Sequence, residues 1–358
     1  MKIKHKSSKF VSAILSVVMI TISSTSVLAA SQSQDVTAMN ESVDVSLQES
    51  GEKDGLEAYV VEQVKKEKNV INAEDYLQEV PKELQEKFDN DSNIKRPASR
   101  ATVTGNPGYN FPTAASGLND KVVRAAFTND VDYHYYSMNI TAGKEYSFIL
   151  TDVPYSCQYH LIIVQESTGG MLYQPVTGAG QTQEYYVSFA QSGKYYVVVA
   201  PVAGYSSSQY SLYFGDMVKS DTFNKSTGMT FSFGYIPFPG SSGWVDYATG
   251  WLYLDLRNES SIPAGSWVTD DYVYLDNSGN GGYWVGLKKY LNFANTDSII
   301  YSQHSGLTPI QVKNDYYAAK QMIGIKGSVN VSTYFEWKPI IRFTYKYGVQ
   351  PSTLWKLR

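Results

Sequence analysis

The chain has 358 residues, 43% of them hydrophobic, and a formal net charge of −4. This length allows two globular units, and the absence of a basic excess argues against a nucleic-acid-binding protein. Cys157 is the only cysteine, so no internal disulfide can form and each unit must rely on a hydrophobic core.

Residues 1–30 have the pattern of a secretory signal peptide. Four lysines precede an apolar stretch from Phe10 to Ile22, and small residues lead to Ala29 and Ala30. A charged start, an apolar middle and a small-residue end are what such signals share. Serines interrupt the apolar stretch, which is too short for a comfortable membrane span. We therefore expect a secreted, extracellular bacterial protein with no membrane span after signal cleavage.

Residues 31–100 form an acidic leader with 16 acidic and 9 basic residues, a net charge of −7. Its first part, residues 31–54, is polar and has the composition of a disordered segment. Apolar residues then recur at helical spacing from Leu56 to Val64 and from Leu77 to Phe88, so two short helices are predicted. One stripe per helix cannot form a core, and a basic linker with a proline follows at residues 95–100. We therefore expect the leader to be separable from the rest.

From Ala101 onward the sequence predicts mostly β structure, in two β-sandwich domains of jelly-roll-like type over residues 101–216 and 217–358. Tyr146, Phe148 and Leu150 alternate with their neighbours and so share one face of a strand. Residues 194–199 are largely apolar on both faces, which is typical of an inner strand.

Five segments of the first predicted sandwich carry a family resemblance through their order and spacing. They are residues 130–136 (DVDYHYY), 141–146 (TAGKEY), 159–164 (YHLIIV), 193–199 (GKYYVVV) and 208–213 (SQYSLY). Residues 106–216 resemble the bacterial pre-peptidase C-terminal domain, a jelly-roll-like sandwich appended to secreted peptidases. The resemblance implies substrate attachment rather than chemistry of its own.

Asp130 and Asp132 are the candidate metal ligands, because carboxylate oxygens suit calcium and this domain type sometimes binds that ion. The alternative is a solvated turn held by an Asx hydrogen bond. The loop before Leu161 has no acidic residue, so the resemblance places no calcium site there. Residues 276–281 imitate the start of an EF-hand loop, but Leu287 occupies its twelfth position, and a hairpin turn is predicted instead.

The second predicted sandwich is rich in aromatic residues. Three leucines from Leu252 to Leu256 alternate with aromatic and charged residues, and Ile341, Phe343, Tyr345 and Tyr347 alternate with polar ones. Exposed aromatic rings can stack on sugars or grip a protein surface, although strands also use them for cross-strand packing. Trp244, in a glycine- and serine-rich stretch, is the candidate binding residue.

Nucleophilic and zinc chemistry find little support in the sequence. Cys157 and His160 lie close together but precede a predicted strand rather than a helix, so a buried or edge thiol is expected. His134, His160 and His304 lack the spacing of zinc ligands.

We expect a secreted, non-catalytic binding or accessory protein that attaches to an extracellular polymer, protein or cell surface, with calcium as the one candidate cofactor. The first alternative is a secreted hydrolase with a glycosidase-like carboxylate pair in residues 217–358. Its candidate carboxylates are Asp246, Asp255, Asp270 and Asp271. The second alternative is an inhibitor or chaperone of a secreted protease, in which residues 55–90 cover a partner.

Overall fold

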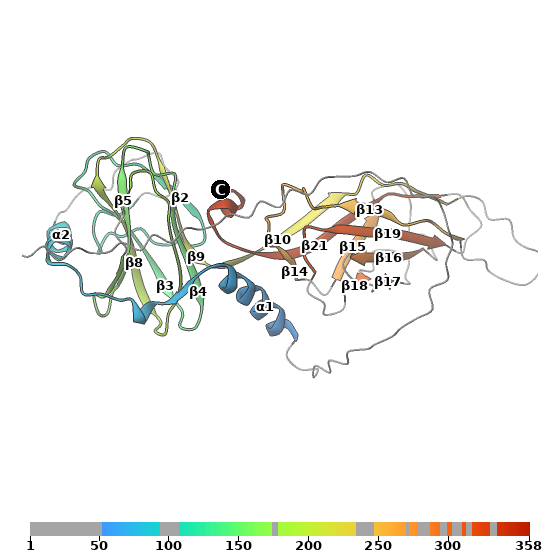
Figure 1. Cartoon of the computed structure of the whole chain (residues 1–358), viewed down its shortest axis with the longest axis horizontal. Coiled ribbons are helices and arrows are strands. Elements are labelled where there is room, and N and C mark those ends of the chain that lie inside the picture. The colour runs from blue at the N-terminus through green and yellow to red at the C-terminus, as the bar shows by residue number, and fades with distance from the viewer. Residues whose placement is uncertain are drawn as a thin grey trace, which may run out of the picture. The chain divides into compact units, whose positions relative to one another are not determined.

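The computed structural model describes residues 52–93, 107–173, 178–233, 247–269, 272–277, 287–293, 299–302, 310–312, 317–329 and 335–358. The predicted signal peptide, the start of the leader and the basic linker lie outside these ranges. Residues Glu49–Arg358 form one compact unit. Most of the described elements are strands, which confirms the predicted fold class (Figure 1). None of the described helices combines the length and the apolar character needed to cross a membrane.

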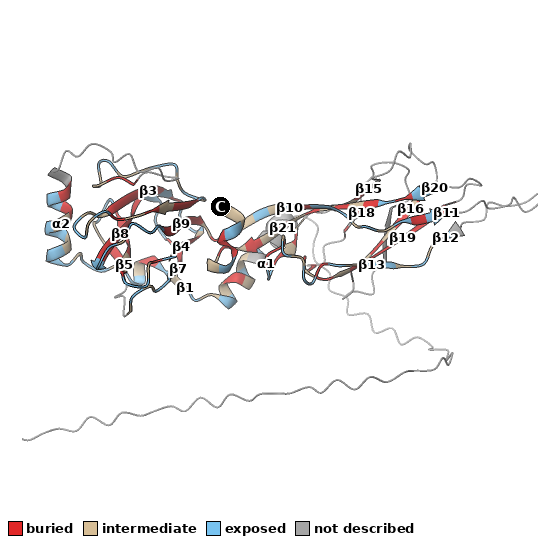
Figure 2. Ribbon diagram, turned by 90° about the horizontal axis from the view of Figure 1, so that it is seen from above, coloured by how far each residue is buried: buried red, intermediate tan, exposed pale blue. Residues whose placement is uncertain are grey.

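The leader has two helices, α1 (Glu52–Glu67) and α2 (Lys82–Asn93). Helix α1 covers the first predicted stripe, whereas α2 begins after Pro81, so Leu77 and Val80 of the second stripe lie outside it. A short strand, β1 (Val70–Asn72), and a 3-10 turn, η1 (Ala73–Asp75), connect them. Helix α2 alternates between buried and exposed residues (Figure 2), as expected for a helix with one apolar stripe.

The first sandwich is a jelly roll of eight strands in two sheets. The strands are β2 (Val122–Ala125), β3 (His134–Ile140), β4 (Glu145–Thr151), β5 (Gln158–Gln165), β6 (Met171–Tyr173), β7 (Gln183–Ser188), β8 (Gly193–Ala203) and β9 (Tyr210–Asp216). One sheet has the order β7-β4-β9-β2 and the other β3-β8-β5-β6. The chain alternates between the sheets except at β5 and β6, which pair with each other, and this is the connectivity of a jelly roll.

The core between these sheets follows the period-two pattern of the sequence. Tyr146, Phe148 and Leu150 point into it, as predicted. Strand β8 lies between β3 and β5, and its two faces are buried in different clusters: Val197 belongs to the inner core and Val198 to the outer cluster. This confirms the predicted inner strand.

The leader takes a larger part in the fold than the sequence predicts. Strand β1 pairs in parallel with β7, with Val70 opposite Tyr186, and so extends the first sheet by one strand. Phe88 of α2 is 2% exposed and packs in the cluster that covers the outer face of the other sheet. Residues 70–91 are therefore integrated into the first sandwich. The expected separability fails for this part because β1 and Phe88 complete surfaces that the sandwich itself exposes.

The second sandwich has two main sheets and a short pair of strands. Its strands are β10 (Val218–Ser226), β11 (Phe231–Phe233), β12 (Tyr247–Ala248), β13 (Leu252–Asp255), β14 (Trp267–Val268), β15 (Tyr272–Asn277), β16 (Lys288–Phe293), β17 (Ile299–Ser302), β18 (Ile310–Gln311), β19 (Met322–Val329), β20 (Phe335–Trp337) and β21 (Pro339–Gly348). One sheet has the order β10-β21-β15-β18 with β14 on β21, and the other β12-β19-β16-β17 with β13 on β19; β11 pairs with β20. The alternating residues from Ile341 to Tyr347 are buried in the core, as predicted.

Strands β15 and β16 correct the predicted hairpin turn after Asp276. Strand β15 pairs with β18 and β21, whereas β16 pairs with β17 and β19. The two strands thus belong to different sheets, and the residues between them, 278–286, lie outside the described ranges. Turn residues alone do not determine whether consecutive strands pair with each other.

A single residue, Met217, separates β9 of the first sandwich from β10 of the second. After β21 the chain forms a 3-10 helix, η2 (Pro351–Leu357), whose Leu354 packs with Val122 and Ile149 of the first sandwich. Both ends of the second sandwich's chain therefore contact the first sheet of the jelly roll.

Candidate functional site

The outer face of the β13–β19–β16 sheet carries the most distinctive side chains of the second sandwich. Pairing places Tyr253 opposite Gly324, and Gly324 opposite Asn292. In the adjacent row Lys326 lies opposite Tyr290. The intervening residues, including Ile323 and Ile325, point into the core. Successive side chains alternate between the faces, so this set points outward. We call Trp251, Tyr253, Tyr290, Asn292, Gly324 and Lys326 the aromatic face.

Gly324 allows two rings to lie directly against the backbone of the sheet. A Cβ atom built there would lie 3.2 Å from Cε3 of Trp251 and 3.2 Å from Cε1 of Tyr253. It would also lie 3.4 Å from Cβ of Asn292. Glycine in the interior of a strand often marks such a close approach. The missing side chain therefore supports a platform of two neighbouring rings.

Lys326 lies between two rings of the aromatic face. Its Nζ is 5.8 Å from the centroid of the Trp251 ring and 5.5 Å from that of Tyr290. Both distances are within the range in which an ammonium group is attracted to a ring face. The Tyr290 hydroxyl is 3.2 Å from Oγ of Ser328, a contact that restrains that ring. The face thus combines three rings with one central cation.

The aromatic face is accessible and contains an unsatisfied polar atom. Tyr253 is 51% exposed, which is uncommon for so large an aromatic side chain in a strand. Oδ1 of Asn292 is buried and has no hydrogen-bond partner among the described residues. Because this atom is buried, the exposed groups of the face, Tyr253 above all, are the ones that a ligand can contact.

Asp255 lies beside the aromatic face and is engaged by its neighbour Arg257. Nε and Nη2 of Arg257 donate to the two carboxylate oxygens over 2.9 and 2.7 Å. This contact lowers the pKa of Asp255 to about 2. A glycosidase acid requires a raised pKa instead, so Asp255 does not suit that role. The other candidate carboxylates, Asp246, Asp270 and Asp271, lie outside the described residues.

The predicted metal ligands lie in the turn before β3. Asp130 is exposed and Asp132 is half-buried. Asn129 organises this turn, because its Oδ1 accepts from the backbone N–H groups of Val131 and Asp132 over 3.0 and 2.8 Å. Its Nδ2 donates to Asp132 over 2.7 Å. Within the described ranges, no three His, Cys, Asp or Glu side chains are grouped to hold a metal ion; calcium binding here stays a prediction.

The structure separates the cysteine and histidines considered from the sequence. Cys157 is buried, as predicted. His160 contacts the ring of Tyr173 at 5.4 Å between centroids. His134 stacks on Phe127 at 4.0 Å, and its Nδ1 lies 2.6 Å from the Tyr210 hydroxyl. Burial lowers the pKa of His134 to about 3, which keeps the ring neutral. His304 and Trp244 lie outside the described residues.

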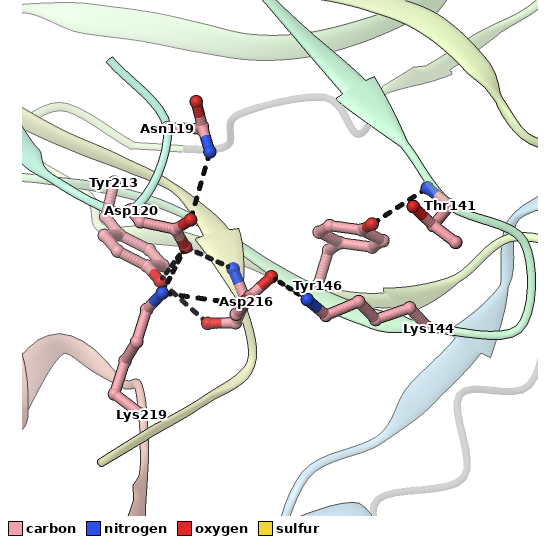
Figure 3. A network of polar contacts seen from close by, with 8 residues as sticks. All are labelled: Asn119, Asp120, Thr141, Lys144, Tyr146, Tyr213, Asp216 and Lys219. Atoms are coloured by element: carbon pink, nitrogen blue, oxygen red, sulfur yellow. Dashed lines mark hydrogen bonds and ion pairs between the residues drawn. The ribbon is translucent and has the colours of Figure 1, made fainter. Parts of the chain in front are cut away.

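A charged network around Asp120 holds the passage from β9 to β10 in place (Figure 3). The Asp120 carboxylate accepts from the backbone N–H of Asp216 over 2.8 Å and contacts Nζ of Lys219 at 2.5 Å. Burial opposes ionisation, but these contacts hold the pKa of Asp120 below its usual value. Lys144 pairs with Asp216 at 2.8 Å. Because its charges neutralise one another, the network supports the fold rather than a ligand.

Sequence reasoning missed the aromatic face, although one of its signals is visible in the sequence. The alternation of Trp251 and Tyr253 with leucines places both rings on the same face of a predicted strand. Tyr290 and Lys326 are more than thirty residues away, and only the strand pairing brings them together.

Comparisons with known proteins do not identify a family. No protein-family model and no curated protein matches the chain. A crystal structure of an Eubacterium rectale protein, whose description proposes that it is secreted, is 14% identical over 64% of this chain and 74% of that one, with a TM-score of 0.27. The infectious bursal disease virus VP2 subviral particle is 11% identical over 60% and 58% of the two chains, with a TM-score of 0.21. The Gt strain of that virus is 10% identical over 76% and 77%, also with a TM-score of 0.21. Similarity at this level carries no argument about function.

Proposed function

We propose that the chain is a secreted, non-catalytic binding or accessory protein that attaches to an extracellular polysaccharide through the aromatic face of its second sandwich. Residues 1–30 direct export in this proposal. Residues 106–216 act as an attachment module of the pre-peptidase C-terminal type, without a peptidase in the described part of the chain. The observation that carries the proposal is the platform of Trp251 and Tyr253 over Gly324.

A flat row of rings suits a sugar polymer for physical reasons. The C–H groups on one face of a sugar ring pack on an aromatic ring, while its hydroxyl groups remain free to hydrogen-bond at the edge. Tyrosine and tryptophan provide this area with few rotatable bonds, so little conformational entropy is lost on binding.

The other functions considered from the sequence have less support. Asp255 is engaged by Arg257, so this candidate carboxylate does not suit the acid of a glycosidase. An inhibitory leader would need its apolar stripes free for a partner. Phe88 instead packs against Phe111 of the same chain, with ring centroids 4.9 Å apart, and Val64 is buried beside Met217.

Retention of the protein on polysaccharides tests the proposal. Mature protein is passed over insoluble cellulose, xylan, pectin and bacterial cell walls, and the W251A/Y253A variant is compared with Y155A. Tyr155 is 94% exposed and lies in the first sandwich, so its removal matches the loss of an exposed ring. We expect W251A/Y253A to weaken retention on the preferred polymer about tenfold or more, whereas Y155A binds like the parent. Equal retention of the parent and both variants, with unchanged melting curves, would refute the proposal.

A further inference from the structure

We infer that the aromatic face selects acidic polysaccharides, with the carboxylate of a uronic acid unit held by Lys326. This inference rests on the proposed function and specifies its ligand. It follows from two observations. Lys326 lies among the rings of the aromatic face, and Asp255, the carboxylate of the adjoining strand, is already paired with Arg257.

Lys326 is the central charge of the aromatic face. Among the described residues it forms no ion pair, and its Nζ lies beside the rings of Trp251 and Tyr290. Asp255, the nearest carboxylate in the adjoining strand, is engaged by Arg257 through two hydrogen bonds. In a chain whose net charge is −4, Lys326 thus places a positive charge among the rings of this face.

The surroundings of Lys326 favour a fixed carboxylate over a mobile counterion. The rings of Trp251 and Tyr290 flank the ammonium group of the half-buried Lys326. The same rings pack against the sugar that carries the carboxylate. A charge-assisted hydrogen bond then forms without further ordering of the lysine side chain. Ring stacking and charge recognition therefore act on the same sugar unit.

The dimensions of the face agree with a polymer rather than a single acid. The centroids of the Trp251 and Tyr290 rings lie 5.8 and 5.5 Å from Nζ of Lys326, so the two rings are at most about 11 Å apart. That distance accommodates about two consecutive sugar units lying across the sheet. One unit would stack over Gly324 on Trp251 and Tyr253, and the next would lie near Tyr290 and Lys326.

Binding to polygalacturonate and to its fully methyl-esterified form tests the inference, because the two polymers share a backbone and differ in charge. The mature protein, K326Q, K326R and K121Q are compared by affinity electrophoresis. Lys121 is exposed in the first sandwich, so K121Q makes the same change in net charge elsewhere. Melting curves confirm that each variant is folded.

We expect the parent, K326R and K121Q to bind the acidic polymer about fivefold more tightly than the ester. K326Q should lose that preference and bind the two polymers about equally. In addition, 0.5 M salt should weaken binding of the acidic polymer only. Equal binding of both polymers by the parent, with both weakened in W251A/Y253A, would overturn the inference and leave the proposed function standing. Absence of binding to every polymer would overturn both.

Discussion

The hydrogen bond between Asp91 and Tyr135 anchors helix α2 to the first sandwich. Asp91, at the end of the leader, is 5% exposed and its Oδ2 accepts from the Tyr135 hydroxyl over 2.7 Å. Tyr135 lies in β3 and is fully buried. D91A would leave that hydroxyl without its acceptor, which costs about 1–3 kcal/mol. A hydrogen bond to a charged group contributes about 1.5–3 kcal/mol, so a double-mutant cycle of D91A and Y135F should show a coupling of that size.

Urea unfolding followed by far-UV circular dichroism measures this coupling. All six tryptophans belong to residues 217–358, and Trp355 of η2 is the one whose element packs on the first sandwich. Tryptophan fluorescence of the W355F background therefore reports the second part of the chain and provides an internal reference. A control cycle pairs Y135F with D89A, because Asp89 is an exposed residue of the same helix that accepts from Gln85 over 2.9 Å. We expect the control coupling to be below about 0.5 kcal/mol. An Asp91–Tyr135 coupling as small as the control would show that α2 does not dock on the sheet in solution.

Three further predictions follow from the structure. His134 has a pKa of about 3 in the folded protein and about 6.5 in the unfolded chain. Below pH 6.5 the unfolded chain therefore takes up a proton that the folded protein does not, and the free energy of unfolding falls as the pH is lowered toward 3. The expected loss is about 2 kcal/mol between pH 6.5 and pH 5. Denaturant titrations at several pH values should show this slope in the parent and not in H134Q, and parallel slopes would contradict it. G324A should weaken polysaccharide binding without a large change in melting temperature, because only the Trp251 and Tyr253 rings must shift. G327A should leave polysaccharide binding unchanged and destabilise the fold by about 1–3 kcal/mol, because its Cβ would lie 2.8 Å from Cζ of Phe233 in the core. If G327A instead weakened binding without destabilising the fold, the assignment of the two faces of β19 would be wrong.

The fold could be predicted from the sequence wherever burial is encoded locally. Phe148 and Leu150 alternate with their neighbours, and both α1 and α2 have apolar residues at helical spacing, so these elements are confirmed. Strand β1 could not be found this way, because three residues are too few to show an alternation. Its parallel partner β7 is more than a hundred residues away, and no local pattern determines such a pairing.

The candidate site shows the same limit. The sequence places Trp251 and Tyr253 on one face of a strand, but that pattern alone does not distinguish core from surface. What exposes the rings is the register that places Ile323 and Ile325 of β19 in the core and Gly324 on the outside. Lys326 becomes the central cation through this register as well. A binding site built from three strands can therefore be found only once the pairing and register of those strands are known.

Cys157 is a natural probe of local opening in the first sandwich. It is the only thiol in the chain and is 1% exposed, so a thiol reagent can reach it only when the surrounding loops open. At low reagent concentration the labelling rate is the product of the opening equilibrium and the reactivity of a free thiol, and so yields the free energy of that opening. The unaltered protein can thus report, by mass spectrometry, whether a polymer held on the second sandwich restrains the first.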